Sequence, residues 1–217
     1  MKKNRFLLIC LLSSILSWAA IAAWAKYKAR PWETNARESY PASLTSEGVT
    51  IAVEPLFTDA LAAGVFDKDD MVTRGIMPLA VIIFNDNDFP IEIDGMSIQL
   101  IHEDDRIRTM SPNEVVNRLF SREKKWIPSP LPRASRSELN AEALDDFDSK
   151  FLMEKMVEPH DKAGGFLFLH IPGSANLASY LSKSVVYIPN VYRRDNNTRM
   201  IYFEIGLDAA IPAGSRR

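Results

Sequence analysis

Cysteine is almost absent from this chain of 217 residues, which contains a single one, Cys10. The rest of the sequence can therefore build no disulfide framework, no thiolate nucleophile and no cysteine-based metal site. Cys10 lies in an apolar stretch, and Ile9 stands before it where a lipoprotein would carry a small residue. We interpret Cys10 as an inert side chain and keep lipid acylation as the alternative.

The chain also lacks the positive charge typical of nucleic-acid-binding proteins. Its formal net charge is −2, and the first 25 residues hold Lys2, Lys3 and Arg5 but no acid. The remainder is consequently more acidic than the whole, which argues against nucleic acid as the main partner. Hydrophobic residues make up 47% and charged residues 25% of the chain, so a folded core is expected rather than disorder.

Catalytic and cofactor signatures are missing as well. The sequence contains no Gly-x-Ser-x-Gly elbow, no phosphate-binding loop and no Gly-x-Gly-x-x-Gly motif, so we expect no enzyme, no catalytic residue and no cofactor. The histidines, His102, His160 and His170, are not spaced as zinc ligands, and we expect hydrogen-bonded side chains at strand ends and in a loop. The acidic groups at 67–70 and 86–88 do not fit an EF-hand loop and are interpreted as solvated turns. A metal site assembled from distant residues stays open.

An uncharged run of 20 residues, Phe6 to Ala25, follows the three basic residues at the N-terminus. A helix of about 20 residues spans roughly 30 Å, the thickness of a hydrocarbon core. Residues 1–25 therefore form a transmembrane anchor or, since Ala23-Trp24-Ala25 fits a cleavage site, a signal peptide. Either alternative delivers the remainder to the periplasmic or extracytoplasmic side of the cell envelope, membrane-anchored or secreted.

Regular periodicity begins near Gly48. Residues 26–47 have weak periodicity and are interpreted as a tether, so we expect the domain at 48–208 to fold without them. Val49, Ile51 and Val53 alternate with small or polar residues, which predicts a half-buried strand. Residues 209–217 are expected to form a tail.

A β-hairpin is the clearest local prediction. The apolar run 77–84 precedes Asn85-Asp86-Asn87-Asp88, which favours a turn, and residues 90–102 then alternate. The apolar positions of this second arm are odd-numbered before Gly95 and even-numbered after it. A strand cannot exchange its buried face without gaining or losing a residue, so Asp94-Gly95 is a bulge or a crossing between sheets.

Two helices are predicted as an insertion at 111–158. Ser111-Pro112-Asn113-Glu114 is a strong start signal, with a capping serine and a glutamate three residues later. The second helix should run from Glu138 to Val157, because Leu139, Ala143, Phe147 and Phe151 recur at four-residue spacing.

Three further strands are predicted at 165–171, 184–192 and 200–207, the first of them central because it is apolar on both faces. About seven strands without βαβ alternation are typical of an antiparallel β-sandwich. The expected fold is thus mainly β, a sandwich with a two-helix insertion, preceded by an N-terminal hydrophobic helix.

The segment Asn85 to Ile91 resembles a connection found in exported bacterial immunoglobulin-like domains, where an asparagine, a polar turn, a proline and an aliphatic residue join neighbouring strands. The resemblance covers residues 49–110 and, more loosely, 166–207. It implies an immunoglobulin-like sandwich in the cell envelope and assigns a role to no residue.

A basic connector joins the two predicted helices. Its candidate partner-docking residues are Lys124, Lys125, Trp126, Arg133 and Arg136. The alternative is that the connector neutralises the acidic helix that follows it. Together these observations predict a non-catalytic envelope module that binds another envelope macromolecule, with a metal-binding or hydrolytic enzyme on a β-sandwich as the second hypothesis.

Overall fold

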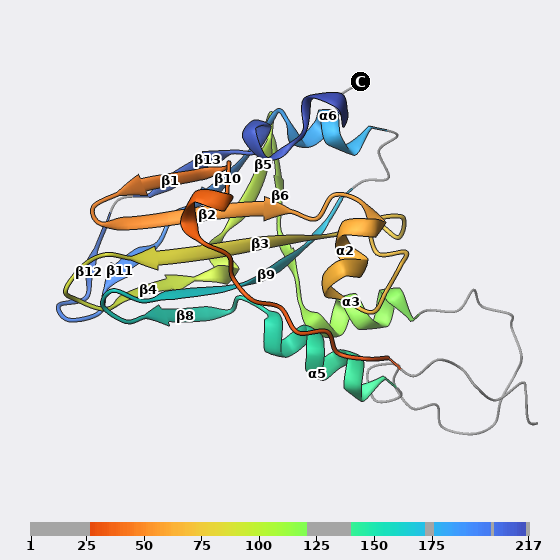
Figure 1. Ribbon diagram of the computed structural model, residues 1–217, viewed down its shortest axis with the longest axis horizontal. Helices are drawn as coiled ribbons and strands as arrows, with labels where there is room; N and C mark the ends of the chain where they lie inside the picture. The colour runs from red at the N-terminus through yellow and green to blue at the C-terminus, as the bar shows by residue number, and fades with distance from the viewer. Residues whose placement is uncertain (1–26, 121–139, 172–175, 201, 216–217) are drawn as a thin grey trace, which may run out of the picture.

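The computed structural model describes residues 27–120, 140–171, 176–200 and 202–215 (Figure 1). The expected N-terminal hydrophobic helix lies outside these residues. Within the described residues the chain is mainly β, with three antiparallel sheets and four α-helices. In this part of the chain no helix combines the length and apolar character needed to cross a bilayer.

The largest sheet has five strands in the order β1-β2-β3-β9-β7. Their bounds are β1 Ser43–Ser46, β2 Val49–Pro55, β3 Ile76–Asn85, β9 Lys162–His170 and β7 Thr109–Met110. Strand β3 lies at its centre and all ten of its residues are buried. This explains the continuous apolar run in the sequence, because a strand covered on both faces needs apolar side chains on both.

Two four-stranded sheets accompany it. One has the order β13-β10-β5-β6 and the other β12-β11-β4-β8. The bounds in the first are β13 Phe203–Gly206, β10 Ser184–Ile188, β5 Gln99–His102 and β6 Asp105–Ile107. The bounds in the second are β12 Thr198–Arg199, β11 Val191–Arg193, β4 Ile91–Asp94 and β8 Glu154–Val157.

The helices are α2 Asp59–Val65, α3 Pro112–Leu119, α5 Ala141–Lys150 and α6 Leu177–Leu181. Short 3₁₀ turns occupy Arg37–Ser39, Gly95–Ser97, Asp208–Ala210 and Ala213–Ser215. Ser111 caps α3 in the predicted capping box, since it accepts from the amide of Glu114 while the Glu114 carboxylate accepts from the amide of Ser111.

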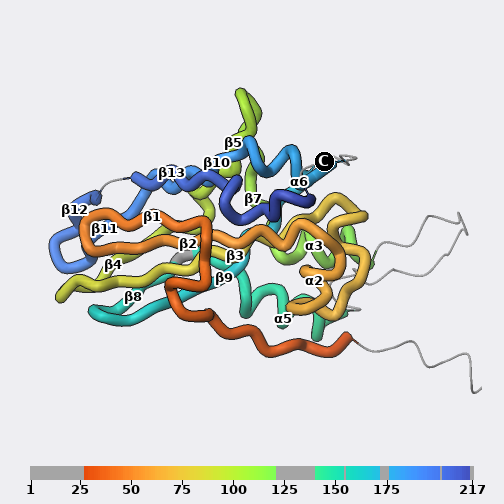
Figure 2. Tube along the Cα trace, turned by 45° about the horizontal axis from the view of Figure 1, so that its top comes forward, coloured from red at the N-terminus to blue at the C-terminus, as the bar shows by residue number. Residues whose placement is uncertain are grey.

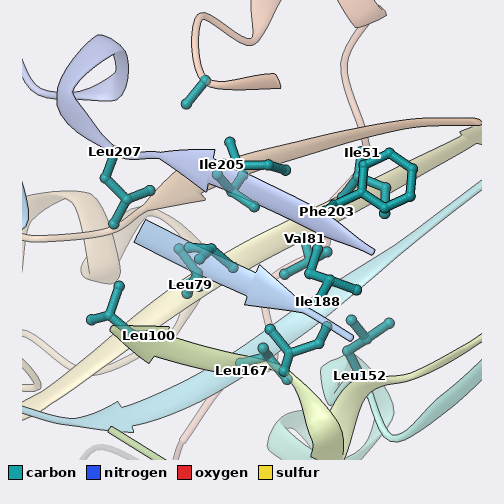
Figure 3. Close-up of a cluster of buried hydrophobic side chains, with 14 of the residues drawn as sticks. Ile51, Leu79, Val81, Leu100, Leu152, Leu167, Ile188, Phe203, Ile205 and Leu207 are labelled. Carbon is teal, nitrogen blue, oxygen red and sulfur yellow. The ribbon is translucent and has the colours of Figure 1, made fainter. Parts of the chain in front are cut away.

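Two hydrophobic cores lie on opposite faces of the five-stranded sheet. Along β3 the odd-numbered Leu79 and Val81 belong to the first core, and the even-numbered Ala80 and Ile82 to the second. The first core is shared with the two smaller sheets, and Figure 3 shows Leu79 and Val81 near Leu100, Ile188 and Phe203. The second core lies under α2, α3 and α5 and is rich in phenylalanine.

The expected hairpin at 77–102 is wrong. Strand β3 pairs with β2 and β9, whereas β4 pairs with β11 and β8, so the turn after Asn85 carries the chain from one sheet to another. Both edges of β3 are already occupied, which leaves no place for β4 beside it. Of the two alternatives predicted at Asp94-Gly95, a bulge or a crossing between sheets, the crossing is confirmed, because β4 and β5 belong to different sheets and a 3₁₀ turn at Gly95 joins them.

The second helix ends earlier than expected, at Lys150. Phe151 has an extended backbone and bridges to Phe166, and residues 154–157 form β8 instead of a last helical turn. The insertion at 111–158 is therefore not purely helical. Pairing with β4 supplies backbone hydrogen bonds that outweigh the helical spacing of Phe151 with Phe147.

The expected tether and tail also need correction. Residues 43–46 form β1 on β2, and Ala42 is 2% exposed in the first core, so the domain begins well before Gly48. The segment before it lies along the domain toward α5, as the red tube of Figure 2 shows. At the other end Ile211 is 1% exposed in the first core, so the tail is packed at least that far.

Candidate functional site

The five predicted docking residues, Lys124, Lys125, Trp126, Arg133 and Arg136, lie outside the described residues. The chain is described up to Phe120 and again from Asn140. Their role in binding a partner stays a prediction.

His102 stands at the end of β5, as expected, and is held by two neighbours. Its Nδ1 lies 3.0 Å from the Ser184 hydroxyl oxygen, and its ring stacks on Tyr180 with centroids 3.6 Å apart. The Ser184 hydroxyl also donates to the Tyr180 carbonyl, and its side chain is buried. This serine is thereby fixed in packing rather than offered to a substrate.

The other two histidines are also hydrogen-bonded. His170 ends β9 with its Nδ1 3.1 Å from the Gly75 carbonyl oxygen, and His160 Nε2 lies 2.8 Å from an Asp88 carboxylate oxygen in a loop. These bonds agree with the prediction for strand ends and loop. Throughout the described ranges no three His, Cys, Asp or Glu side chains lie close enough to hold a metal ion.

Two carboxylates of the acidic clusters, those of Asp70 and Asp86, pair with neighbouring bases. Asp70 pairs with Lys68 at 2.9 Å and with Arg74 at 2.5 Å, and Asp86 pairs with Arg37 at 2.6 Å. The hydrogen bond from Arg37 lowers the pKa of Asp86 below its ordinary value. These carboxylates are therefore occupied by ion pairs.

The most developed polar arrangement involves residues 27–42, named here the N-terminal segment, which crosses the helical face of the domain. The Tyr27 ring lies 6.1 Å from Phe147 of α5 and 6.3 Å from Phe120, centroid to centroid. Further along, the Trp32 ring lies 4.5 Å from Phe166 of β9. These aromatic contacts extend the second core onto the segment.

A partly buried three-residue cluster, Tyr27, Asp146 and Lys150, fastens the start of the segment to α5, and we call it the clamp. The Tyr27 hydroxyl donates to Asp146 Oδ2 at 2.6 Å, and Lys150 Nζ donates to Asp146 Oδ1 at 2.7 Å. The side chains of Lys150 and Asp146 are only 10% and 4% exposed. Lys150 also donates to the Val65 carbonyl at 3.1 Å, so the buried ion pair is well supplied with hydrogen bonds.

The electrostatics of the clamp keep Tyr27 protonated. Burial raises the pKa of its hydroxyl, and the hydrogen bond to the Asp146 carboxylate raises it further. The neutral hydroxyl is the form that can donate to Asp146. At neutral pH Tyr27 thus serves as a stable donor rather than as an acid or base.

Asp67 provides a second attachment next to the clamp. It accepts from the Lys28 amide at 2.9 Å and pairs with Arg30 at 3.1 Å. The Lys28 hydrogen bond lowers the pKa of Asp67. Arg30 also donates to the Ala63 carbonyl of α2. Residues 27–30 are consequently tied to both α5 and the region of α2.

Four surface depressions follow the N-terminal segment in order. Their volumes are about 340, 460, 420 and 290 Å³ from the Tyr27 end to the Arg37 end. The first is lined by Tyr27, Arg30, Ala63, Asp67, Lys68, Asp69 and Phe120. Arg30 and Asp67 of this lining pair with each other, Lys68 pairs with Asp70, and Tyr27 donates to Asp146. These contacts suit attachment of a chain segment better than chemistry on a substrate.

Sequence patterns alone did not reveal the clamp. Asp146 and Lys150 are spaced i, i+4 on the face of α5 that also buries Phe147, a spacing that could have indicated a buried ion pair. Tyr27 gave no such signal, because it is separated from Asp146 by 119 positions in the chain.

Comparison with known proteins adds little. No protein-family model matches the chain, and no curated protein sequence matches it. Among solved structures, the yjhA protein from Bacillus subtilis is similar over 69% of this chain and 79% of its own, with 14% sequence identity and a TM-score of 0.37. A likeness of this degree supports no inference about fold family or function.

Proposed function

We propose that this chain is a membrane-anchored envelope protein whose domain lies on the extracytoplasmic side and acts as a non-catalytic binding or structural module. The observation that carries the proposal is the clamp. Tyr27 follows the hydrophobic run by two positions and is hydrogen-bonded to Asp146 inside the domain. The run is thereby joined to a folded domain almost without an intervening linker.

The length of the run favours an anchor over a cleaved peptide. It holds 20 uncharged residues, whereas the apolar region of a signal peptide commonly has about 7–15. Lys26, Lys28 and Arg30 follow it directly, a flank that suits the end of a membrane span. The immunoglobulin-like topology implied by the Asn85 to Ile91 segment stays part of this proposal.

Fractionation of cells that make the intact chain tests the location. We expect the protein in the membrane fraction after a carbonate wash, an intact mass that includes residues 1–25, and digestion of the domain by protease added to spheroplasts. A soluble protein whose N-terminus is Lys26 would contradict the anchor and establish cleavage.

Crosslinking in the native envelope tests the binding role. The proposal expects a reproducible macromolecular partner, and it expects purified protein to carry no stoichiometric metal. Tightly held zinc or calcium at one ion per chain would instead favour the metal-binding alternative.

A further inference from the structure

The domain has two ends that differ in how they relate to the membrane run. Strand β3, Ile76–Asn85, starts near α2 and ends at the opposite side of the domain, before the turn that leads to β4 (Figure 1). Ten residues of strand extend over roughly 30 Å. Tyr27, Ala63 and Asp69 line one depression at the α2 end, whereas Asp88 lies in the turn at the other end.

Chain connectivity places the hydrophobic run at the α2 end. Only Lys26 stands between Ala25 and Tyr27. Because consecutive Cα atoms are 3.8 Å apart, the Cα atoms of Ala25 and Tyr27 are at most about 8 Å apart. The clamp therefore fixes where the domain meets the end of the run.

We infer that the α2 end of the domain, marked by Tyr27, Ala63, Lys68, Asp69 and Phe120, lies against the lipid headgroups of the membrane that holds the run 6–25. This inference rests on the proposed function, since it requires that the run is retained as an anchor. The opposite end, with Asp88, then points away from the bilayer.

Ion pairing lowers the negative charge that the α2 end presents to an anionic surface. Asp67 is paired with Arg30 at 3.1 Å, and Asp70 with Lys68 and Arg74. Each of these pairs cancels a negative charge that would otherwise be repelled by anionic lipid. Asp146 is likewise paired with Lys150 and buried, so it adds no exposed charge.

The clamp is what distinguishes this arrangement from a loose tether. If residues 26–41 were free, their 16 residues could reach about 55 Å and the domain could take any orientation. The hydrogen bonds from Tyr27 to Asp146 and from the Lys28 amide to Asp67 hold the start of this segment on the domain, so the free length of chain between the run and the domain is lost. A variant that removes both attachments should therefore lose the fixed orientation while it keeps the anchor.

Two matched fluorescent positions test the inference in the full-length chain. In a Cys10→Ser background, Asp69→Cys and Asp88→Cys each place a bimane label on an exposed loop aspartate, one at each end. The proteins are reconstituted in phosphatidylcholine vesicles with a minor share of phosphatidylglycerol, some of whose lipids carry a headgroup nitroxide. Quenching by the nitroxide should be severalfold stronger at position 69 than at position 88.

A second pair of variants tests the cause. Adding Tyr27→Ala and Asp67→Ala to the Asp69→Cys chain removes both attachments but leaves Asp146 paired with Lys150, and it should reduce quenching toward that seen at position 88. Circular dichroism of the same sample tests whether the domain stays folded. Adding Asp195→Ala, which breaks an exposed ion pair with Arg193 elsewhere in the domain, should leave the quenching unchanged.

The outcomes separate the inference from the proposed function. Equal quenching at both positions, in protein that stays with the vesicles, overturns the inference and leaves the anchor intact. Protein that fails to insert overturns both. Strong quenching at position 69 that persists without both attachments shows that another contact holds the domain and overturns the assigned cause.

Discussion

Tyr27 and Asp146 are hydrogen-bonded at 2.6 Å across 119 positions of the chain, and this bond joins the first described residue to helix α5. Asp146 is almost completely buried, so its carboxylate depends on Tyr27 and Lys150 for compensation. The clamp consequently stabilises the domain at a point only two positions after the hydrophobic run 6–25 in the chain.

Removing the Lys150 charge should be strongly destabilising. Lys150→Met leaves the Asp146 carboxylate buried without its counter-ion, and breaking a buried pair in this way costs about 3–5 kcal/mol. Urea unfolding of the chain from Lys26 onward measures the change. The exposed Lys183→Met serves as the control and should shift the free energy of unfolding by less than about 0.5 kcal/mol. Equal, small effects from the two substitutions would refute a structural role for the ion pair.

Alkaline pH should weaken the clamp. Burial and Asp146 raise the folded-state pKa of Tyr27 above its ordinary value of 10.0. The folded state then holds the proton more tightly than the unfolded state, so this contribution to stability is complete below pH 10.0 and is lost as the pH rises above it. Stability measured from pH 8 to 11 should fall less steeply for Tyr27→Phe than for the natural chain. Parallel profiles would be inconsistent with the raised pKa.

Gly95 marks a close approach that no side chain can fill. A Cβ there would lie 1.9 Å from the Leu152 carbonyl oxygen, so Gly95→Ala should displace the backbone and destabilise the fold by several kcal/mol, about 3 or more. Gly64 of α2 has open space around it, and Gly64→Ala should be neutral or stabilising by about 0.5–1 kcal/mol. Thermal unfolding of both variants compares them. If Gly95→Ala left the unfolding temperature unchanged, the backbone at the crossing between sheets would not be constrained by Leu152.

Asn85 should tolerate a change to aspartate poorly. Its side-chain nitrogen donates to the carbonyls of Phe89, Val157 and Glu158 at 2.8, 3.2 and 3.1 Å. Asn85→Asp replaces that donor with a carboxylate and should lower stability at pH 7 by about 2–3 kcal/mol, with partial recovery in acid as the carboxyl becomes a donor. The exposed Asn196→Asp keeps its acceptor role toward the Thr198 amide and is the matched control. A loss independent of pH would argue that packing rather than hydrogen bonding explains the effect.

Local signals predicted much of this fold. The exchange of buried faces at Gly95 indicated the crossing between sheets, and Ser111 with Glu114 gave the start of α3. These succeeded because face alternation and helix capping depend on neighbouring residues alone. The uninterrupted apolar run of β3 likewise reflected burial on both faces.

Tertiary contacts determined what the sequence could not show. The turn after Asn85 is polar like that of a hairpin, yet β9 from far along the chain occupies the edge of β3 that a hairpin would use. Phe151 continues the four-residue apolar spacing of α5, which predicted a longer helix. Residues 154–157 instead form backbone hydrogen bonds with β4 as strand β8. The clamp depends on contact between Tyr27 and α5, which are far apart in the sequence. The residues around Tyr27 show only the weak periodicity that is typical of a tether.

Trp32 offers the most direct test that the N-terminal segment belongs to the domain. In a chain that starts at Lys26 and carries Trp126→Phe, Trp32 is the single remaining tryptophan, and its ring packs on Phe166. Urea titration should then be followed by Trp32 fluorescence and by far-ultraviolet circular dichroism in the same samples. The structure predicts coincident transitions, as expected when the segment and the sheets unfold as one cooperative unit. A fluorescence transition complete at lower urea than the loss of β-structure would show that the segment is a detachable tether and would contradict the clamp.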